Sequence, residues 1–166
     1  MGRRLLPRTL PELFAHALAV EREAMKRFEE LAQFMRDTGF DHLAEELEAI
    51  GREEREQHDT LALGTADRRL PEISSWEYAW HHLGPQADKV APPTSAREAL
   101  ALALAVERRT QFFYADVAEN VSDDAVSAFA AEMAADEQRH IARLETLLQR
   151  EPDPARRSDE PDGVMA

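Results

Sequence analysis

The sequence has 166 residues, of which 43% are hydrophobic and 32% charged, and this composition favours one soluble domain with a substantial core. It contains no cysteine, which excludes disulfides, iron–sulfur clusters and thiol catalysis, so any metal site must be built from Asp, Glu and His. The formal net charge of −13 argues against nucleic acid as a partner. The absence of a long apolar run argues against a membrane segment or a secretory signal, and we therefore expect a cytoplasmic protein.

Two helices are predicted in the first half of the chain, each with apolar residues at i, i+3, i+4 and i+7. The first helix covers about residues 10–37, with Thr9 as its N-cap signal and Gly39 as its stop signal. The second helix covers about residues 41–63. Because only a short turn separates them, we expect the two helices to form an antiparallel hairpin.

The second half of the chain repeats this arrangement. Ser95 with Glu98 three residues later is typical of a capping box, and it begins a predicted helix over about residues 95–120. A further helix over about residues 123–150 follows after a short turn, which predicts a second antiparallel hairpin.

A long connection, residues 65–94, joins the two predicted hairpins. It is long enough to run back along a helix of roughly 37 Å, so residues 1–150 fit an all-α antiparallel four-helix bundle with one crossover between the second and third helices. We expect a short helix near residues 72–82 and a disordered tail over residues 151–166. The crossover contains four side chains with two possible roles: anchoring it onto the bundle or a dimer partner, or contacting a second metal or a cofactor. They are Trp76, Trp80, His81 and His82.

A short motif occurs once in each half of the sequence. Residues 17–22 read ALAVER and residues 103–108 read ALAVER again. About thirty residues after each copy comes an acidic segment that carries a histidine, residues 53–58 (EEREQH) and residues 136–140 (DEQRH). The repeat offers four carboxylates, one from each helix, and two imidazoles, a set that suits two metal ions inside a bundle.

Four glutamates lie in the middle of apolar stripes, although a single glutamate in an acidic chain usually lies on a solvated face. Glu21, for example, has Ala17, Ala24 and Phe28 at −4, +3 and +7. Burying bare carboxylates costs several kcal/mol each, so these groups must be protonated, paired with arginine or neutralised by metal. Nearby arginines mostly turn away from the stripes, which favours metal. The four inward glutamates, one per helix, are Glu21, Glu54, Glu107 and Glu137.

Two histidines complete the candidate metal site. His140 lies three residues after Glu137, on the same helix face. His58 lies four residues after Glu54, whereas Gln57 occupies the +3 position, and the two positions lie on opposite sides of the Glu54 direction by about 40° and about 60°. A π-bulge between Glu54 and His58, or a distorted ligand, would bring His58 to the site. The predicted ligands are Glu21, Glu54, His58, Glu107, Glu137 and His140.

These residues give the chain a resemblance to the ferritin-like di-iron superfamily, and specifically to its rubrerythrin-like branch, over about residues 10–150. The segments LAVEREAMKRFEELAQ, LALAVERRTQFFYADVAENVSDD and FAAEMAADEQRHIARLETLL carry it. Tyr114 falls where family members often keep a tyrosine near the metals, and Leu104 stands where rubrerythrins carry an extra glutamate. The resemblance implies that the two irons are bridged by Glu54 and Glu137, with Glu21 and His58 completing one iron and Glu107 and His140 the other.

The resemblance also implies an activity. We expect a di-iron oxidoreductase that reacts with O2 or hydrogen peroxide, as a peroxidase or a ferroxidase, with an iron–manganese pair as the alternative cofactor. A chain without cysteine cannot hold a rubredoxin centre, so electrons would come from an external donor. The resemblance also implies a homodimer. Two other functions stay open: a di-iron oxygenase or hydroxylase acting on an organic substrate, and a metal-free four-helix scaffold.

Overall fold

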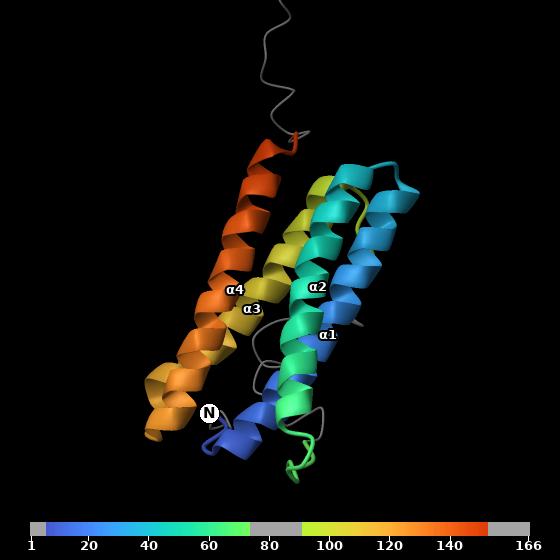
Figure 1. The fold of residues 1–166 in the computed structure, drawn as a ribbon. Coiled ribbons are helices and arrows are strands. Elements are labelled where there is room, and N and C mark those ends of the chain that lie inside the picture. The colour runs from blue at the N-terminus through green and yellow to red at the C-terminus, as the bar shows by residue number, and fades with distance from the viewer. Residues whose placement is uncertain (1–5, 74–90, 153–166) are drawn as a thin grey trace, which may run out of the picture.

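The computed structural model describes residues 6–73 and 91–152, and within them every regular element is a helix. The helices are α1 (Leu10–Asp37), α2 (Asp41–Gly64), α3 (Ala96–Asn120) and α4 (Asp124–Arg150), and they form the predicted four-helix bundle (Figure 1). Each predicted helix begins and ends within one residue of these bounds. None of the described helices is long and apolar enough to cross a bilayer.

The sequence signals at the helix ends act through defined hydrogen bonds. Thr9 Oγ1 accepts from the Glu12 backbone N–H at 3.3 Å, and Ser95 Oγ accepts from the Glu98 N–H at 3.1 Å, so each N-cap satisfies an N–H that the helix itself leaves unpaired. After α1 the chain turns at Gly39, whose φ of 86° is a conformation that glycine adopts without a steric penalty.

The helices are paired as two antiparallel hairpins, α1 with α2 and α3 with α4 (Figure 1). Because α2 and α3 run in the same direction, Gly64 and Ala96 lie at opposite ends of the bundle, as a single crossover requires. Most of the predicted short helix, its tryptophans and histidines, and most of the predicted tail lie outside the described residues. Glu72 and Ile73, the described residues of the predicted short helix, are not helical.

The core is divided into two apolar clusters. One contains Phe28, Leu47, Leu100 and Leu144 among others, and it fills the end of the bundle that holds the α1–α2 turn. The second cluster, at the other end, includes Leu13, Phe113, Val126 and Met133. Along each helix the buried glutamate falls between the residues of the two clusters, so the fold places one acidic layer midway along the bundle, shielded from water at both ends.

Candidate metal centre

The acidic layer contains one glutamate from each helix: Glu21, Glu54, Glu107 and Glu137. All four side chains have 0% exposure, as their apolar neighbours predicted. The acidic layer also contains His140, which is 3% exposed. One ligand atom from each of four residues lies within 4.8 Å of the others, a spacing that one metal ion can bridge, and these residues are Glu54, Glu107, Glu137 and His140.

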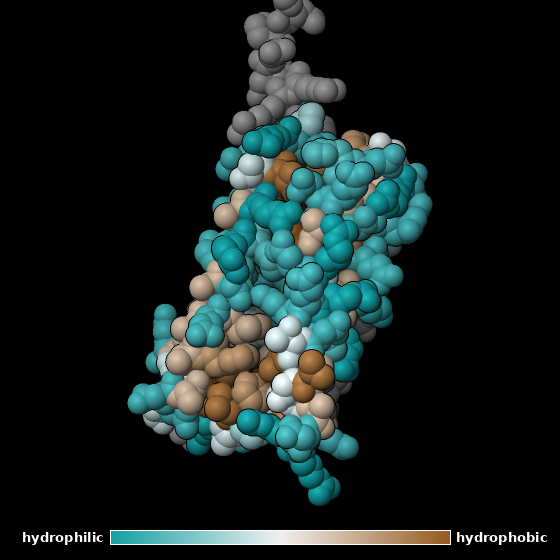
Figure 2. All heavy atoms as spheres, viewed as in Figure 1, coloured by the Kyte–Doolittle hydropathy of each residue, from teal (hydrophilic) through white to brown (hydrophobic). Residues whose placement is uncertain are grey.

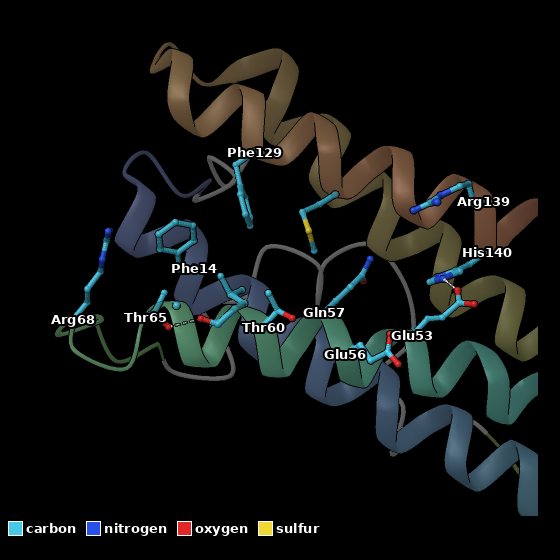
Figure 3. A pocket seen from close by; sticks show the side chains of 13 residues that line it. Phe14, Glu53, Glu56, Gln57, Thr60, Thr65, Arg68, Phe129, Arg139 and His140 are labelled. Carbon is cyan, nitrogen blue, oxygen red and sulfur yellow. Dashed lines mark hydrogen bonds and ion pairs between the residues drawn. The ribbon is translucent and has the colours of Figure 1, made fainter.

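His140 is oriented by carboxylates on both sides of its ring. Its Nδ1 lies 2.8 Å from Glu54 Oε1, 3.3 Å from Glu107 Oε2 and 3.8 Å from Glu137 Oε2, so this nitrogen faces the acidic layer. Its Nε2 lies 2.7 Å from Glu53 Oε2 at the edge of the bundle (Figure 3). An Nε2–H that donates to Glu53 leaves the Nδ1 lone pair free for a metal. A carboxylate is a usual partner for the second ring nitrogen of a metal-binding histidine.

Glu53 is held in place by Arg143, whose Nη1 donates to Glu53 Oε1 at 3.1 Å. Partial burial opposes ionisation of Glu53, but the nearby His140 and Arg143 outweigh it and lower the pKa of its carboxyl. An ionised Glu53 is therefore available to fix the His140 ring. The repeat contained this signal, because an acidic residue immediately precedes the inward glutamate in both halves, but we did not assign it a role from the sequence.

Glu21 lies in the acidic layer beside Tyr114, which is also fully buried. The Tyr114 hydroxyl donates to Glu21 Oε1 at 3.2 Å, so the tyrosine lies near the acidic layer, where the resemblance had placed it. Burial, followed by the charges of Glu21, Glu137 and Glu54, raises the pKa of Tyr114 well above its usual range, and the phenol stays protonated as a donor.

The acidic layer without metal carries more negative charge than its one imidazole can balance. Burial is the main cause that raises the pKa of Glu21, Glu107 and Glu137. Neighbouring carboxylates add to the rise for Glu21 and Glu137, whereas the contacts of Glu107 with Glu137 and His140 oppose it. Burial alone would lower the pKa of His140, but its contacts with Glu107, Glu137 and Glu54 raise it far above the usual value. Bound protons therefore compensate the charge when no cation is present.

Several buried oxygens in the acidic layer have no hydrogen-bond donor. They belong to every one of the four inward glutamates and include Glu21 Oε2, Glu54 Oε2, Glu107 Oε1 and Glu137 Oε1. Buried acceptors without donors are rare in folded proteins because each costs desolvation free energy. Carboxylate oxygens with one imidazole nitrogen are suitable ligands for iron or manganese, so the residues present fit a carboxylate-rich metal centre.

His58 is placed differently from the other predicted ligands. Helix α2 is regular over its whole length, so the π-bulge hypothesised between Glu54 and His58 does not form. The His58 Nδ1 lies 3.1 Å from Asp59 Oδ1, while its Nε2 is buried without a hydrogen-bond partner. His58 does not belong to the group of four that a single ion could bridge, and its ligation stays a prediction.

A pocket of about 670 Å³ opens next to His140, between α2 and α4. Phe14 and Phe129 lie toward its far end, where Thr65 and Arg68 also line it, whereas Gln57 and His140 lie toward the end near the acidic layer (Figure 3). Figure 2 shows apolar side chains gathered around this hollow at the lower end of the bundle. The pocket arises because α2 and α4 belong to different hairpins and pack less closely than the helices within each hairpin.

Comparison with known proteins supports both the fold and the family. The family model for rubrerythrin matches residues 12–150. A solved structure of an uncharacterized conserved protein from Magnetospirillum magnetotacticum MS-1 is similar to this chain, with a TM-score of 0.76 and 29% sequence identity, covering 88% of this chain and 97% of that one. No protein with curated annotation matches significantly. The match over residues 12–150, together with the carboxylate–histidine layer, shows that the chain belongs to the rubrerythrin family.

Proposed function

We propose that the acidic layer binds two divalent metal ions, with iron as the principal metal, and that the protein is an oxidoreductase acting on hydrogen peroxide or O2. One observation carries the proposal: four fully buried carboxylates share one layer with His140, three of them close to its Nδ1, and each of the four has an oxygen without a hydrogen-bond donor. Neither core packing nor solubility explains such an arrangement, because apolar residues at these positions would be more stable.

Each residue has a defined role in this proposal. Glu54 and Glu137 lie on helices of different hairpins and would bridge the two ions. Glu107 and the Nδ1 of His140 would bind one ion, and Glu21 the other. Glu53 orients the His140 ring, and Tyr114 holds Glu21 through its hydroxyl. The apolar clusters on both sides keep bulk water from the ligands, which strengthens their electrostatic interactions.

Iron bound there would supply two-electron redox chemistry, reducing hydrogen peroxide to two waters or O2 to hydrogen peroxide. The pocket beside His140 provides a path for these small oxidants. Since the chain has no cysteine, the electrons that restore the reduced state come from an external donor. Peroxide removal and iron oxidation are the two physiological uses that this chemistry supports.

The test is metal content followed by reaction with oxidant. Protein purified from iron-supplemented cells is expected to contain about two metal ions per chain, and the anaerobic ferrous protein to consume one hydrogen peroxide per pair of ions. Glu137→Ala is expected to lose both properties, while Glu132→Ala, which replaces an exposed residue of the same helix, keeps them. A wild-type protein with near-zero iron, manganese and zinc, and an unchanged melting temperature after chelation, would favour the scaffold instead.

Oxygenation of an organic substrate is the second candidate function, and the pocket favours it. A volume of about 670 Å³ exceeds what peroxide or O2 requires and falls within the range of small-molecule sites. Indole and octanol are simple apolar probes. If the iron-loaded, reduced protein incorporates an atom of isotopically labelled O2 into either probe, the oxygenase function is supported. Oxidant consumption without binding of either probe would restrict the protein to peroxide and O2 reduction.

A further inference from the structure

The two halves of the repeat correspond residue by residue around the acidic layer. Glu54 corresponds to Glu137, and three residues after each of them come Gln57 and His140. The residues immediately before the two glutamates, Glu53 and Asp136, correspond as well. Gln57 therefore occupies in the first half the position that His140 occupies in the second.

The contacts of these residues follow the same correspondence. His140 on α4 reaches Glu53 on α2, with 2.7 Å between Nε2 and Oε2. Gln57 on α2 reaches back to Asp136 on α4, where its Nε2 donates to Oδ2 at 3.1 Å. An arginine compensates each outer carboxylate: Arg143 pairs with Glu53, and Arg139 pairs with Asp136.

In these contacts His140 and Gln57 each use their Nε2, which leaves the second polar atom of each side chain available for another partner. For His140, the remaining Nδ1 faces the acidic layer. For Gln57, the remaining Oε1 is buried and has no hydrogen-bond partner. His58, by contrast, corresponds to Ile141, which is an apolar core residue 4% exposed. The correspondence therefore favours Gln57 over His58 as the counterpart of the ligating histidine.

We propose that Gln57 Oε1 is the ligand that completes the first metal subsite, with Glu21, Glu54 and Glu137, and that Asp136 is the positioning residue that orients its amide. The inference rests on the proposed function, because it assigns the ligands of the same centre. Under this assignment the two subsites are chemically unequal. The first offers only oxygen, and the second adds the His140 imidazole.

Unequal ligands give the two subsites different metal preferences. Carboxylate and amide oxygens suit Mn²⁺, whereas an imidazole adds affinity for Fe²⁺, Co²⁺ and Zn²⁺. The affinity for Fe²⁺, Co²⁺ or Zn²⁺ should therefore exceed the affinity for Mn²⁺ by a smaller factor at the first subsite than at the second. Given both ions, the protein should form a mixed centre, with Mn²⁺ beside Gln57 and Fe²⁺ beside His140.

The test measures metal binding on the full chain without any turnover. Metal-free protein is loaded with Mn²⁺ and then titrated anaerobically with Co²⁺, while the electron paramagnetic resonance signal of free Mn²⁺ counts the released ions. Wild type is expected to bind two Mn²⁺ per chain and to release them in two steps, one at low and one at higher Co²⁺. Gln57→His should merge the steps by lowering the Co²⁺ needed for the second release at least about tenfold.

Two further variants identify the ligand. Gln57→Leu is expected to bind one ion per chain, whereas His58→Leu keeps two ions and both release steps. Two ions in Gln57→Leu with unchanged release, or loss of one ion in His58→Leu, would overturn the assignment of Gln57. Gln57→His is expected to gain affinity for Co²⁺, so it tests the assignment even if Gln57→Leu folds poorly. If a folded Gln57→His protein still releases Mn²⁺ in two separate steps, Gln57 is not the ligand. A wild type that binds no divalent ion refutes the proposed function itself.

Discussion

Glu137→Gln should change the stability of the protein in opposite directions with and without metal. The substitution keeps the size of a fully buried side chain, removes its charge and removes a ligand. In the metal-free protein it should stabilise the fold, because one of several mutually repelling carboxylates disappears. In the metal-loaded wild type the same carboxylate binds cations, so the variant should be the less stable of the two proteins.

The structure sets the size of both effects. The ligand atoms lie within 4.8 Å of one another, where two unit negative charges repel by about 3 kcal/mol at an effective dielectric constant of 20. Bound protons already relieve part of this repulsion, so we expect a gain of about 1–3 kcal/mol in the metal-free variant. For a chain of this length 1 kcal/mol corresponds to about 3 °C, which gives a rise of about 3–9 °C.

Metal acts in the opposite direction in the wild type. One ion at a hundredfold excess over its dissociation constant stabilises the fold by about 2.7 kcal/mol, so two ions should raise the melting temperature by about 15 °C. Thermal unfolding followed by circular dichroism gives the melting temperatures of wild type and Glu137→Gln, each with Mn²⁺ and with a chelator. Glu132→Gln on the exposed side of α4 is the matched control and should match wild type in both conditions. A metal-free Glu137→Gln protein that melts below metal-free wild type would refute the charge argument.

Three further predictions test the groups around the acidic layer. The folded-state pKa values of Glu21, Glu137 and His140 are raised, so the folded metal-free protein binds protons more tightly than the unfolded chain. This stabilisation is complete below the ordinary pKa of each group and is lost as pH rises through the raised one. The melting temperature of the metal-free wild type should therefore fall from pH 5 to pH 8 more steeply than that of Glu137→Gln, and equal slopes would contradict the raised pKa values. Tyr114→Phe leaves Glu21 Oε1 without its donor and should cost about 1–2 kcal/mol in urea unfolding of the metal-free protein; an unchanged midpoint would show that the hydrogen bond contributes nothing. Glu53→Ala frees the His140 ring and should weaken metal binding by roughly 10- to 100-fold in calorimetric titration while the fold stays intact; unchanged affinity would remove Glu53 from the centre.

Much of the fold could be predicted from the sequence because its signals are local. Helix periodicity and the capping residues Thr9, Ser95 and Gly39 depend only on neighbours within a turn, and they placed all four helices. The inward direction of the four glutamates followed from the same periodicity: Glu21, for example, has Ala17, Ala24 and Phe28 at −4, +3 and +7, and a carboxylate in such a stripe shares its buried face. The burial of Glu21, Glu54, Glu107 and Glu137 confirms that step.

What the sequence could not determine is how the faces of different helices meet. A helix positions successive residues 100° apart, so a +3 and a +4 residue both point broadly inward, and only the rotation of α2 against α4 distinguishes them. That rotation directs Gln57 toward Asp136, aims His140 Nδ1 at the carboxylates and Nε2 at Glu53, and leaves a pocket between the hairpins. The repeated ALAVER motif determined that each half contributes carboxylates to a common layer. Tertiary packing decided which atoms face one another there, because contacts between helices depend on relative rotation and register that no single helix encodes.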